Sequence, residues 1–348
     1  MTVVQARFDH LHRLSDDTGL HEHATGATPL RHHGYCLDDV ARGLVVLCRQ
    51  PAPLGPLAGL VERYLAFTVH AQTADGYFHN RLGYDRRWQD RPGLGDWWGR
   101  ALWGLGTAAA RCPDPWVRET ASTCFATSAQ HRPPWVRSMA FAALGAAEML
   151  TIQPDHGPAL ALLADSAALI GGPRSDTAWP WPERRLHYAN AVLPEVLIAA
   201  GRALGDDRTL AGGLDLLGWL LTSETRDGHL SPTPAGGWSP GEQRPAFAQQ
   251  PIEAAAIADA CARAFEVTGD TRWADGVRLA TGWFLGDNDA RIPLHDPRTG
   301  GGFDGLEAGR RNVNQGAEST LALISTLQLR HSTREARWTT NHTPLPTS

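Results

Sequence analysis

Hydrophobic positions along this chain fall into helical segments that alternate with loops rich in Gly, Pro, Trp and acidic residues. The loops recur at intervals of roughly 50 residues, apart from a longer last step, and this interval is in the range of helical repeats. They begin near residues 17, 75, 130, 175, 227 and 304. The pattern therefore predicts a repeated two-helix unit.

The segment before each loop has apolar residues three and four positions apart with charges between them, as around Leu217 and Leu221. This spacing predicts an outer helix with one wet face. Asp114, Asp206 and Asp270 are typical helix-starting residues. The predicted outer helices are 2–14, 57–72, 114–129, 157–170, 207–222 and 271–285.

The segment after each loop is richer in Ala, Leu and Gly and apolar on most sides. This composition predicts inner helices that are packed all round. They are predicted over 35–48, 97–110, 135–150, 189–204, 251–267 and 315–329.

Six outer and six inner helices in alternation predict an all-α fold, an (α/α)6 barrel or six-hairpin toroid of about twelve helices. An open solenoid is the alternative. Strand signals are weak throughout. We expect one domain over 1–331, followed by a flexible polar tail over 332–348.

Charge and composition exclude several classes of protein. The net charge of −5, with no basic run, argues against a nucleic-acid partner. All 32 Lys+Arg residues are arginine, which excludes a Schiff-base lysine, a P-loop lysine and a kinase lysine. No Gly-x-Gly-x-x-Gly follows a strand, so we expect no cofactor.

The five cysteines are odd in number and lack Cys-x-x-Cys spacing, which indicates buried thiols in a reducing compartment. Residues 1–14 have no continuous apolar core of the kind that a signal peptide needs. No apolar run approaches the roughly 18 residues of a membrane helix. We therefore expect a cytoplasmic protein without a membrane partner.

In the predicted barrel, the outer-to-inner loops and the first turns of the inner helices open on one face. Carboxylates, amides and aromatic rings gather in these segments. Aromatic rings stack on the apolar faces of sugars, while carboxylates and amides bond hydroxyl groups. This mixture predicts a carbohydrate ligand. The candidate binding residues are His33, Tyr35, Asp96, Trp97, Trp98, Arg100, Trp181, His187, Tyr188, Asn190, Trp238, Gln249, Gln250, Asn314 and Gln315.

Glycoside cleavage needs two carboxyl groups, one to protonate the leaving oxygen and one to act as nucleophile or to activate water. Asp38, Asp39, Glu253 and Glu318 are the catalytic candidates, with Asp39 and either glutamate as the expected pair. A carboxylate in the first turn of a helix is favoured in its ionised form, so it suits a base better than an acid.

Structural roles are open for the same residues. Glu253 and Glu318 can cap their own helices, and Asp96 precedes Trp97 at an N-cap position. The two aspartates can form an ion pair with Arg42 or another arginine of the rim. Trp103, Trp219 and Trp283 fall in helices and indicate packing, whereas Trp88, Trp181 and Trp238 fall in loops and argue for a ligand.

Six histidines lie within the first 33 residues, among them the His21-Glu22-His23 run. This run lacks the i, i+4 spacing of a helical zinc site and has no companion cysteine, so we expect no metal. Cys36 lies near His33 but has no acidic residue to orient a catalytic histidine, and no Gly-x-Ser-x-Gly is present.

Four motifs resemble a bacterial family of six-hairpin, glycosidase-like proteins. They are residues 33–42 (HGYCLDDVAR), 186–191 (LHYANA), 249–254 (QQPIEA) and 314–320 (NQGAEST), and the resemblance extends from about residue 8 to 329. Members of the family occur alone or behind a glycosyltransferase domain, whose label they often carry. The resemblance implies an (α/α)6 barrel, a glycoside hydrolase-like role on oligosaccharides or polysaccharides, including mannose-containing ones, and a glycosyltransferase as partner.

Two other functions stay open. A sugar epimerase or lyase of this fold would use histidine as acid and base, here His33 or His187. A non-catalytic glycan-binding module would assist a transferase. Opposed carboxyl groups roughly 5 to 10 Å apart would favour hydrolysis. Carboxylates engaged in helix capping or arginine pairs would favour binding alone.

Overall fold

The computed structural model describes the backbone of residues 4–342 and the side chains of residues 4–336. The described residues form twelve α-helices. Their bounds are α1 Asp9–Leu14, α2 Leu37–Cys48, α3 Ala58–Ala71, α4 Asp96–Arg111, α5 Pro115–Ser128, α6 Val136–Ile152, α7 Gly157–Ile170, α8 Val192–Leu204, α9 Asp207–Ser223, α10 Pro251–Thr268, α11 Thr271–Leu285 and α12 Ala317–His342.

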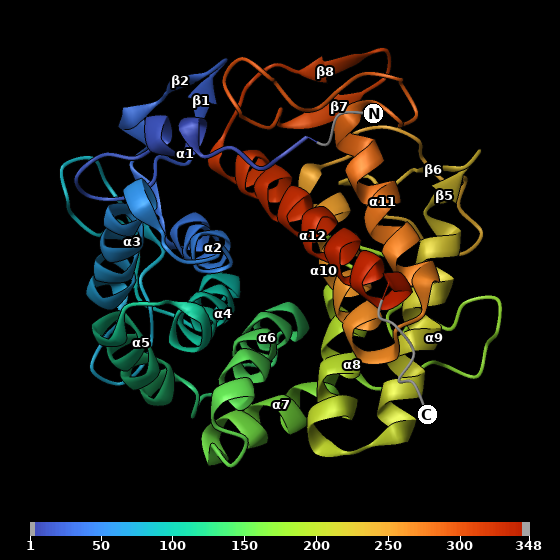
Figure 1. The fold of residues 1–348 in the computed structure, drawn as a ribbon, viewed down its shortest axis with the longest axis horizontal. Coiled ribbons are helices and arrows are strands. Elements are labelled where there is room, and N and C mark those ends of the chain that lie inside the picture. Colours follow the sequence, from blue (N-terminus) through green and yellow to red (C-terminus); the bar gives the residue numbers. More distant parts are fainter. Residues whose placement is uncertain (1–3, 343–348) are drawn as a thin grey trace.

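The helices form two concentric rings (Figure 1). The even-numbered helices α2 to α12 form the inner ring, in which each helix packs on the next and α12 returns to α2. The odd-numbered helices lie outside them, and α1 packs on α12. The ring is closed, so the open solenoid is wrong and the (α/α)6 barrel is confirmed.

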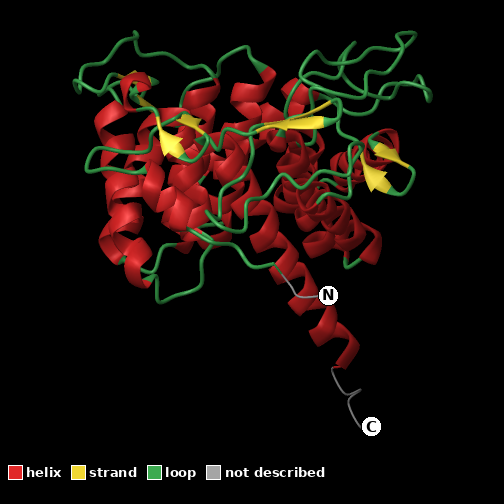
Figure 2. Cartoon of the chain, turned by 90° about the horizontal axis from the view of Figure 1, so that it is seen from above, coloured by secondary structure: helices red, strands yellow, loops and turns green. Residues whose placement is uncertain are grey.

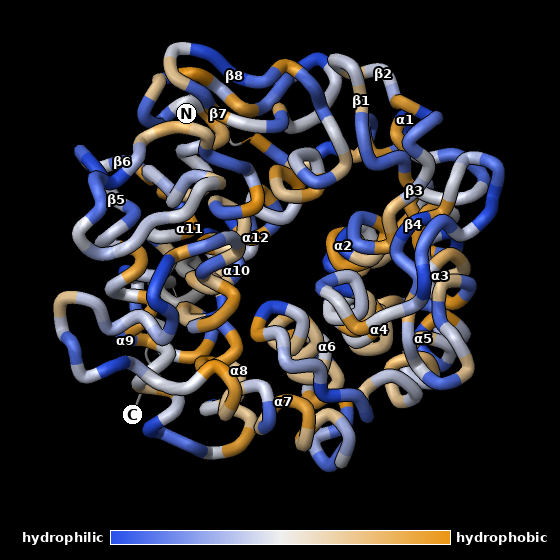
Figure 3. The backbone as a smooth tube through the Cα atoms, turned by 180° about the vertical axis from the view of Figure 1, so that it is seen from behind, coloured by the Kyte–Doolittle hydropathy of each residue, from blue (hydrophilic) through white to orange (hydrophobic). Residues whose placement is uncertain are grey.

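Burial follows the predicted difference between the rings. In the outer helix α9, the buried residues Gly213, Leu216, Leu217 and Leu220 share one face, whereas the inner helix α6 is buried from Arg137 to Leu150. The aspartates predicted to start α5, α9 and α11 each accept a backbone N–H as N-caps. Figure 3 shows hydrophilic stretches running through the peripheral loops of the face where the inner helices begin.

Four two-stranded antiparallel sheets lie in the loops at the end of the barrel where the inner helices begin (Figure 2). The last residues of α12 project from the opposite end. Short strands in these loops were not predicted. They are β1 Ala24–Thr25 with β2 Thr28–Pro29, β3 Tyr35–Cys36 with β4 Arg81–Leu82, β5 Thr225–Arg226 with β6 His229–Leu230, and β7 Gly305–Glu307 with β8 Arg310–Asn312.

The two ends of the chain differ from the sequence-based expectation. The first helix is only Asp9–Leu14, because Val4, Ala6 and Phe8 pack on the core at every second position. That period is typical of extended chain and not of a helix. The last helix runs to His342, into the stretch predicted as a tail, and residues 343–348 lie outside the described residues.

The cysteines and the helices bear on two further expectations. All five cysteines lie buried as free thiols, as their spacing predicted. None of the described helices combines the length and the apolar character that crossing a membrane requires.

Helices α4 and α6 approach each other more closely than a Cβ atom allows. A Cβ on Gly145 would lie 2.1 Å from the carbonyl oxygen of Leu102, and one on Gly106 would lie 2.2 Å from that of Gly145. The neighbouring atoms belong to helix backbone, which cannot move without displacing an inner helix. Glycine is therefore a packing requirement at this contact.

We predict that Gly145→Ala lowers the free energy of unfolding by at least about 2 kcal/mol, through overpacking. Gly218→Ala is the matched control in the outer helix α9, where the nearest atom to a new Cβ is 3.9 Å away. It should be neutral or stabilising by up to about 1 kcal/mol, because alanine favours helix. Urea unfolding of both variants measures the difference, and equal effects would contradict the close approach.

Candidate functional site

All five candidate acidic residues stand in the first turns of inner helices, and Glu253 begins α10. Asp38 and Asp39 begin α2, Asp96 begins α4 and Glu318 begins α12. Because the inner helices run parallel to one another around the ring, their first turns converge on one mouth of the barrel.

Two arginines hold three of these carboxylates. The Arg42 Nη2 atom lies 2.5 Å from Asp39 Oδ1, and its Nη1 atom lies 2.9 Å from Glu318 Oε2. The Arg100 Nη1 atom lies 2.8 Å from Asp38 Oδ1. Ion pairs with Arg42 or another arginine of the rim were the structural alternative for the two aspartates, and both form one. The Arg42–Glu318 pair joins α2 to α12, and the Arg100–Asp38 pair joins α4 to α2.

Burial separates the two adjacent aspartates. The side chain of Asp38 is 23% exposed and that of Glu318 is 41% exposed, so both are accessible from the mouth. Asp39 is only 2% exposed. Loss of water on burial raises the pKa of Asp39 to about 7, although the positive charge of Arg42 opposes this rise.

Glu253 occupies a different environment from the other candidates. Its Oε1 atom accepts the N–H of Ala189 at 2.5 Å, and its Oε2 atom accepts that of Asn190 at 3.3 Å. The φ of Ala189 is +47°, a backbone conformation that needs support from its surroundings. Glu253 therefore caps the turn before α8 and not its own helix.

The carboxyl of Glu253 is 4% exposed. Burial, with a further contribution from the nearby Glu224, raises the pKa of Glu253 to about 8, although the two backbone N–H groups oppose this rise. The side chain lies outside the central cavity, whose wall at this level is the neighbouring Ile252. In this position, Glu253 acts as an anchor of the loop.

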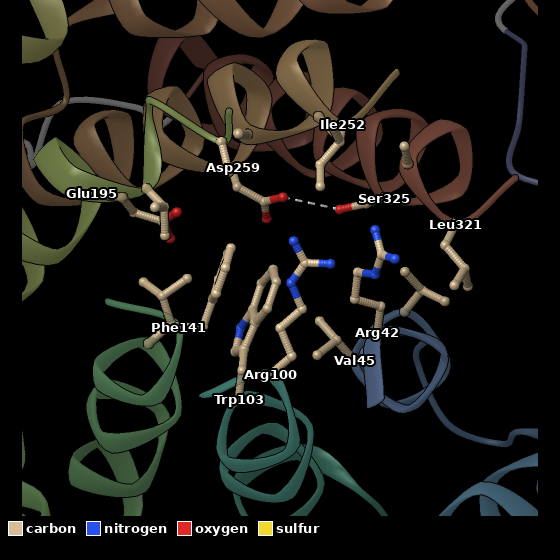
Figure 4. A pocket seen from close by; sticks show the side chains of 17 residues that line it. Arg42, Val45, Arg100, Trp103, Phe141, Glu195, Ile252, Asp259, Leu321 and Ser325 are labelled. Carbon is tan, nitrogen blue, oxygen red and sulfur yellow. Dashed lines mark hydrogen bonds between the residues drawn. The ribbon is translucent and has the colours of Figure 1, made fainter. Parts of the chain in front are cut away.

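The central cavity extends from the mouth into the barrel between the inner helices (Figure 4). Arg42 and Arg100 lie in its wall, together with the aromatic side chains of Trp103 and Phe141. Its volume of about 60 Å³ is well below the roughly 300 Å³ at which small-molecule sites begin. This cavity is therefore too narrow for a sugar ring.

Deeper in the cavity, one or two turns beyond the rim, lie polar residues that the sequence analysis did not single out. Glu195, Asp259 and Ser325 are among them, and the Ser325 hydroxyl donates to Asp259 Oδ2 at 3.2 Å (Figure 4). These helices are apolar on most sides, so the sequence has little signal that marks these residues. None of the described residues that line this cavity is a histidine.

Asp96 is not the N-cap that its position indicated. Gly95 occupies the N-cap of α4, and no side chain caps the helix there. Burial raises the pKa of Asp96, although the positive charge of Arg100 opposes this rise. Its carboxyl is half-buried beside the mouth.

Several aromatic candidates are packed in the core and cannot stack on a sugar. Trp98 and Trp181 have no exposed surface, and Tyr35 is 1% exposed. Trp181 stacks on Trp219 at 5.9 Å between ring centroids, which attaches its loop to α9. Trp97, Tyr188 and Trp238 are partly exposed and remain candidates.

The amide candidates hold loops in place. Gln249 is 1% exposed, donates to Asp289 and accepts from the indole N–H of Trp283. Gln315 donates to Asp296, and Asn190 is fully buried. Gln250 and Asn314 are partly exposed, while His33 and His187 are exposed at the rim.

Three potential metal ligands lie within 4.8 Å of one another, from Glu22, Cys36 and Asp39. Both carboxylates already bind guanidinium groups, of Arg81 and Arg42 respectively. Burial and the charge of Asp39 raise the pKa of the Cys36 thiol. A neutral thiol and two nearby positive charges make a poor site for a cation.

No family model matches the sequence, and no curated protein does. Solved structures do match in fold. A cellobiose 2-epimerase from Bacillus thermoamylovorans gives a TM-score of 0.69 and 11% identity over 94% of this chain and 96% of that one.

Two mannanases match this chain over a similar share of their length. The α-mannanase of family GH76 from Bacteroides thetaiotaomicron gives a TM-score of 0.66 and 11% identity over 94% of this chain and 95% of its own. An α-1,6-mannanase from Salegentibacter gives 0.63 and 9% over 92% and 96%. The chain thus has the six-hairpin glycosidase-like fold, which sugar epimerases and glycoside hydrolases share.

The environment of Glu253 predicts a pH-dependent difference in stability between the wild type and Glu253→Gln. Because the pKa of Glu253 is raised on folding, the folded wild type binds a proton that the unfolded chain releases. Relative to the variant, wild-type stability should fall by about 1.4 kcal/mol per pH unit from about pH 5 to pH 8.

Urea unfolding across this range measures the difference. The matched control is Glu318→Gln, because a side chain that is 41% exposed sheds little of its water on folding. A difference between wild type and Glu253→Gln that stays constant with pH would show that Glu253 is not buried as described.

Proposed function

We propose that this protein hydrolyses glycosidic bonds of an oligosaccharide or polysaccharide at the mouth of the barrel. The observation that carries the proposal is the pair of adjacent aspartates at the start of α2, each held by an arginine that lines the cavity. Enzymes with this fold act on carbohydrate, and the Salegentibacter mannanase is known in an inactive form with two consecutive aspartates replaced by asparagine.

The two aspartates suit different roles. A carboxyl with a pKa of about 7 holds a proton near neutrality, so Asp39 fits the acid that protonates the leaving glycosidic oxygen. Asp38 and Glu318 are exposed enough to contact the substrate. One of them would attack the anomeric carbon or take the proton of the attacking water. We assign Glu253 to positioning the loop with His187 and Tyr188.

The proposal of a particular sugar rests on two observations. The α-1,6-mannanase was solved with α-1,6-mannotriose, and the resemblance of this sequence includes mannose-containing glycans. We therefore propose mannose-containing oligosaccharides as the substrate class, with a cytoplasmic location. A glycosyltransferase partner stays a prediction.

Epimerisation has less support. It would need histidines that move the proton at the reacting carbon, whereas hydrolysis would use the carboxylates gathered at the mouth. His33 and His187 lie exposed in the rim loops. Glycan binding without catalysis is the second candidate, and a specific observation favours it. All four catalytic candidates are engaged, three by arginine and one by backbone N–H groups.

We predict that the protein releases products from α-1,6-linked mannooligosaccharides, and that Asp38→Asn and Asp39→Asn each lower kcat/KM by at least about 100-fold. Anomer-resolved NMR of the products measures turnover and shows whether the course is retaining or inverting. The matched control is Asp165→Asn, since Asp165 pairs with Arg132 on the outer ring.

The possible outcomes distinguish hydrolysis, epimerisation and glycan binding without catalysis. A new reducing end that depends on the two aspartates supports hydrolysis. A changed sugar without a new reducing end would mean epimerisation. Saturable binding of mannooligosaccharides and glucooligosaccharides without any turnover would overturn hydrolysis and leave the binding module.

A further inference from the structure

A second cleft opens beside the mouth, between the first turns of α4 and α6. Its volume is about 610 Å³, and Trp97, Trp135, Asp96 and Arg91 line it together with a glycine-rich loop. This space is large enough for a pyranose ring, in contrast to the central cavity. The sequence analysis did not single out Trp135.

Trp135 contributes an exposed aromatic surface that the fold does not use. It occupies the N-cap of α6, makes no side-chain cap hydrogen bond and is 56% exposed. A residue such as Ser or Asp stabilises a helix better at this position. Trp135 thus presents its indole to solvent at the edge of the cleft, where an aromatic face is available for stacking.

Trp97 forms the second aromatic wall and is fixed in place. Its indole N–H donates to the carbonyl oxygen of Phe78 at 2.8 Å. The ring lies against the backbone of Gly93 and Gly95, where a Cβ would come within 3.1 Å and 2.2 Å of it. A rigid aromatic ring loses little entropy on binding a ligand.

Asp96 links the cleft electrostatically to the candidate site. The carboxyl of Asp96 interacts electrostatically with Arg100, which binds Asp38 at the mouth. Asp96 is half-buried and offers acceptor atoms for hydroxyl groups, and Arg91 offers donors. Two indoles beside a carboxylate and a guanidinium suit a sugar ring better than an apolar peptide.

We propose that this cleft is a sugar subsite, in which Trp135 and Trp97 stack on one unit of an oligosaccharide whose next unit enters the mouth. The inference rests on the proposed function, since it takes the same chain of sugars. It makes Trp135 a determinant of chain-length preference. A monosaccharide occupying the mouth alone does not contact it.

The experiment is a titration of α-1,6-mannooligosaccharides and β-1,4-glucooligosaccharides, from the monosaccharide to the pentasaccharide, followed by chemical-shift changes. Trp135→Ala should weaken binding of the longer members of one series about tenfold and leave the monosaccharide unchanged. Trp135→Phe should retain most of the affinity. Trp116→Ala is the matched control, because Trp116 is 46% exposed and begins α5 at the opposite end of the barrel.

The outcomes distinguish this inference from the proposed function. Turnover with equal affinities for Trp135→Ala and Trp116→Ala would overturn the subsite and leave hydrolysis standing. Binding that depends on Trp135 without turnover would support the subsite and overturn hydrolysis. If no member of either series binds, the subsite is wrong.

Discussion

The closed inner ring depends on arginine–carboxylate pairs between its helices. At least one partner of several such pairs is nearly buried, as Arg100, Glu148 and Glu195 are, and an unpaired buried charge costs about 3 to 5 kcal/mol. Arginine suits this role because its guanidinium stays charged when buried and can bind a carboxylate with two N–H groups at once. The chain has arginine and no lysine, which agrees with this role. The pairs are Arg100 with Asp38, Arg42 with Glu318, Arg49 with Asp259, Arg111 with Glu148 and Arg263 with Glu195.

The same pairs constrain the chemistry of the mouth. Arg42 binds both Asp39 and Glu318, so a substrate that recruits either carboxylate alters the contact between α2 and α12. Asp39 is buried enough for its pKa to rise, yet its arginine limits that rise. Asp39 can thus stabilise the ring through Arg42 and still have a pKa of about 7. The hydrolysis proposed for this mouth would use such a carboxyl beside a second one.

The sequence predicts the rings well because helical period and helix-capping aspartates are local signals. It fails where a side chain is placed by a distant segment. The loop tryptophan Trp181 was expected at the surface, but its partner Trp219 lies on the next outer helix and removes it from solvent. Cavity residues such as Trp103 and Asp259 were missed because an all-round buried helix has no polar stripe to mark its inward face.

Glu253 and Asp38 show how far helix position alone can identify a site residue. Both lie in the first turn of an inner helix, and the sequence supports the same role for each. The loop before α8 folds over Glu253 and presents two N–H groups to it, whereas the side chain of Asp38 stays 23% exposed and meets Arg100. The environment of each carboxyl is therefore set by the loop next to it. Because the cavity lined by Arg42 and Arg100 is too narrow for a sugar, we expect the length and path of those loops to decide which of the first-turn carboxylates can meet a substrate.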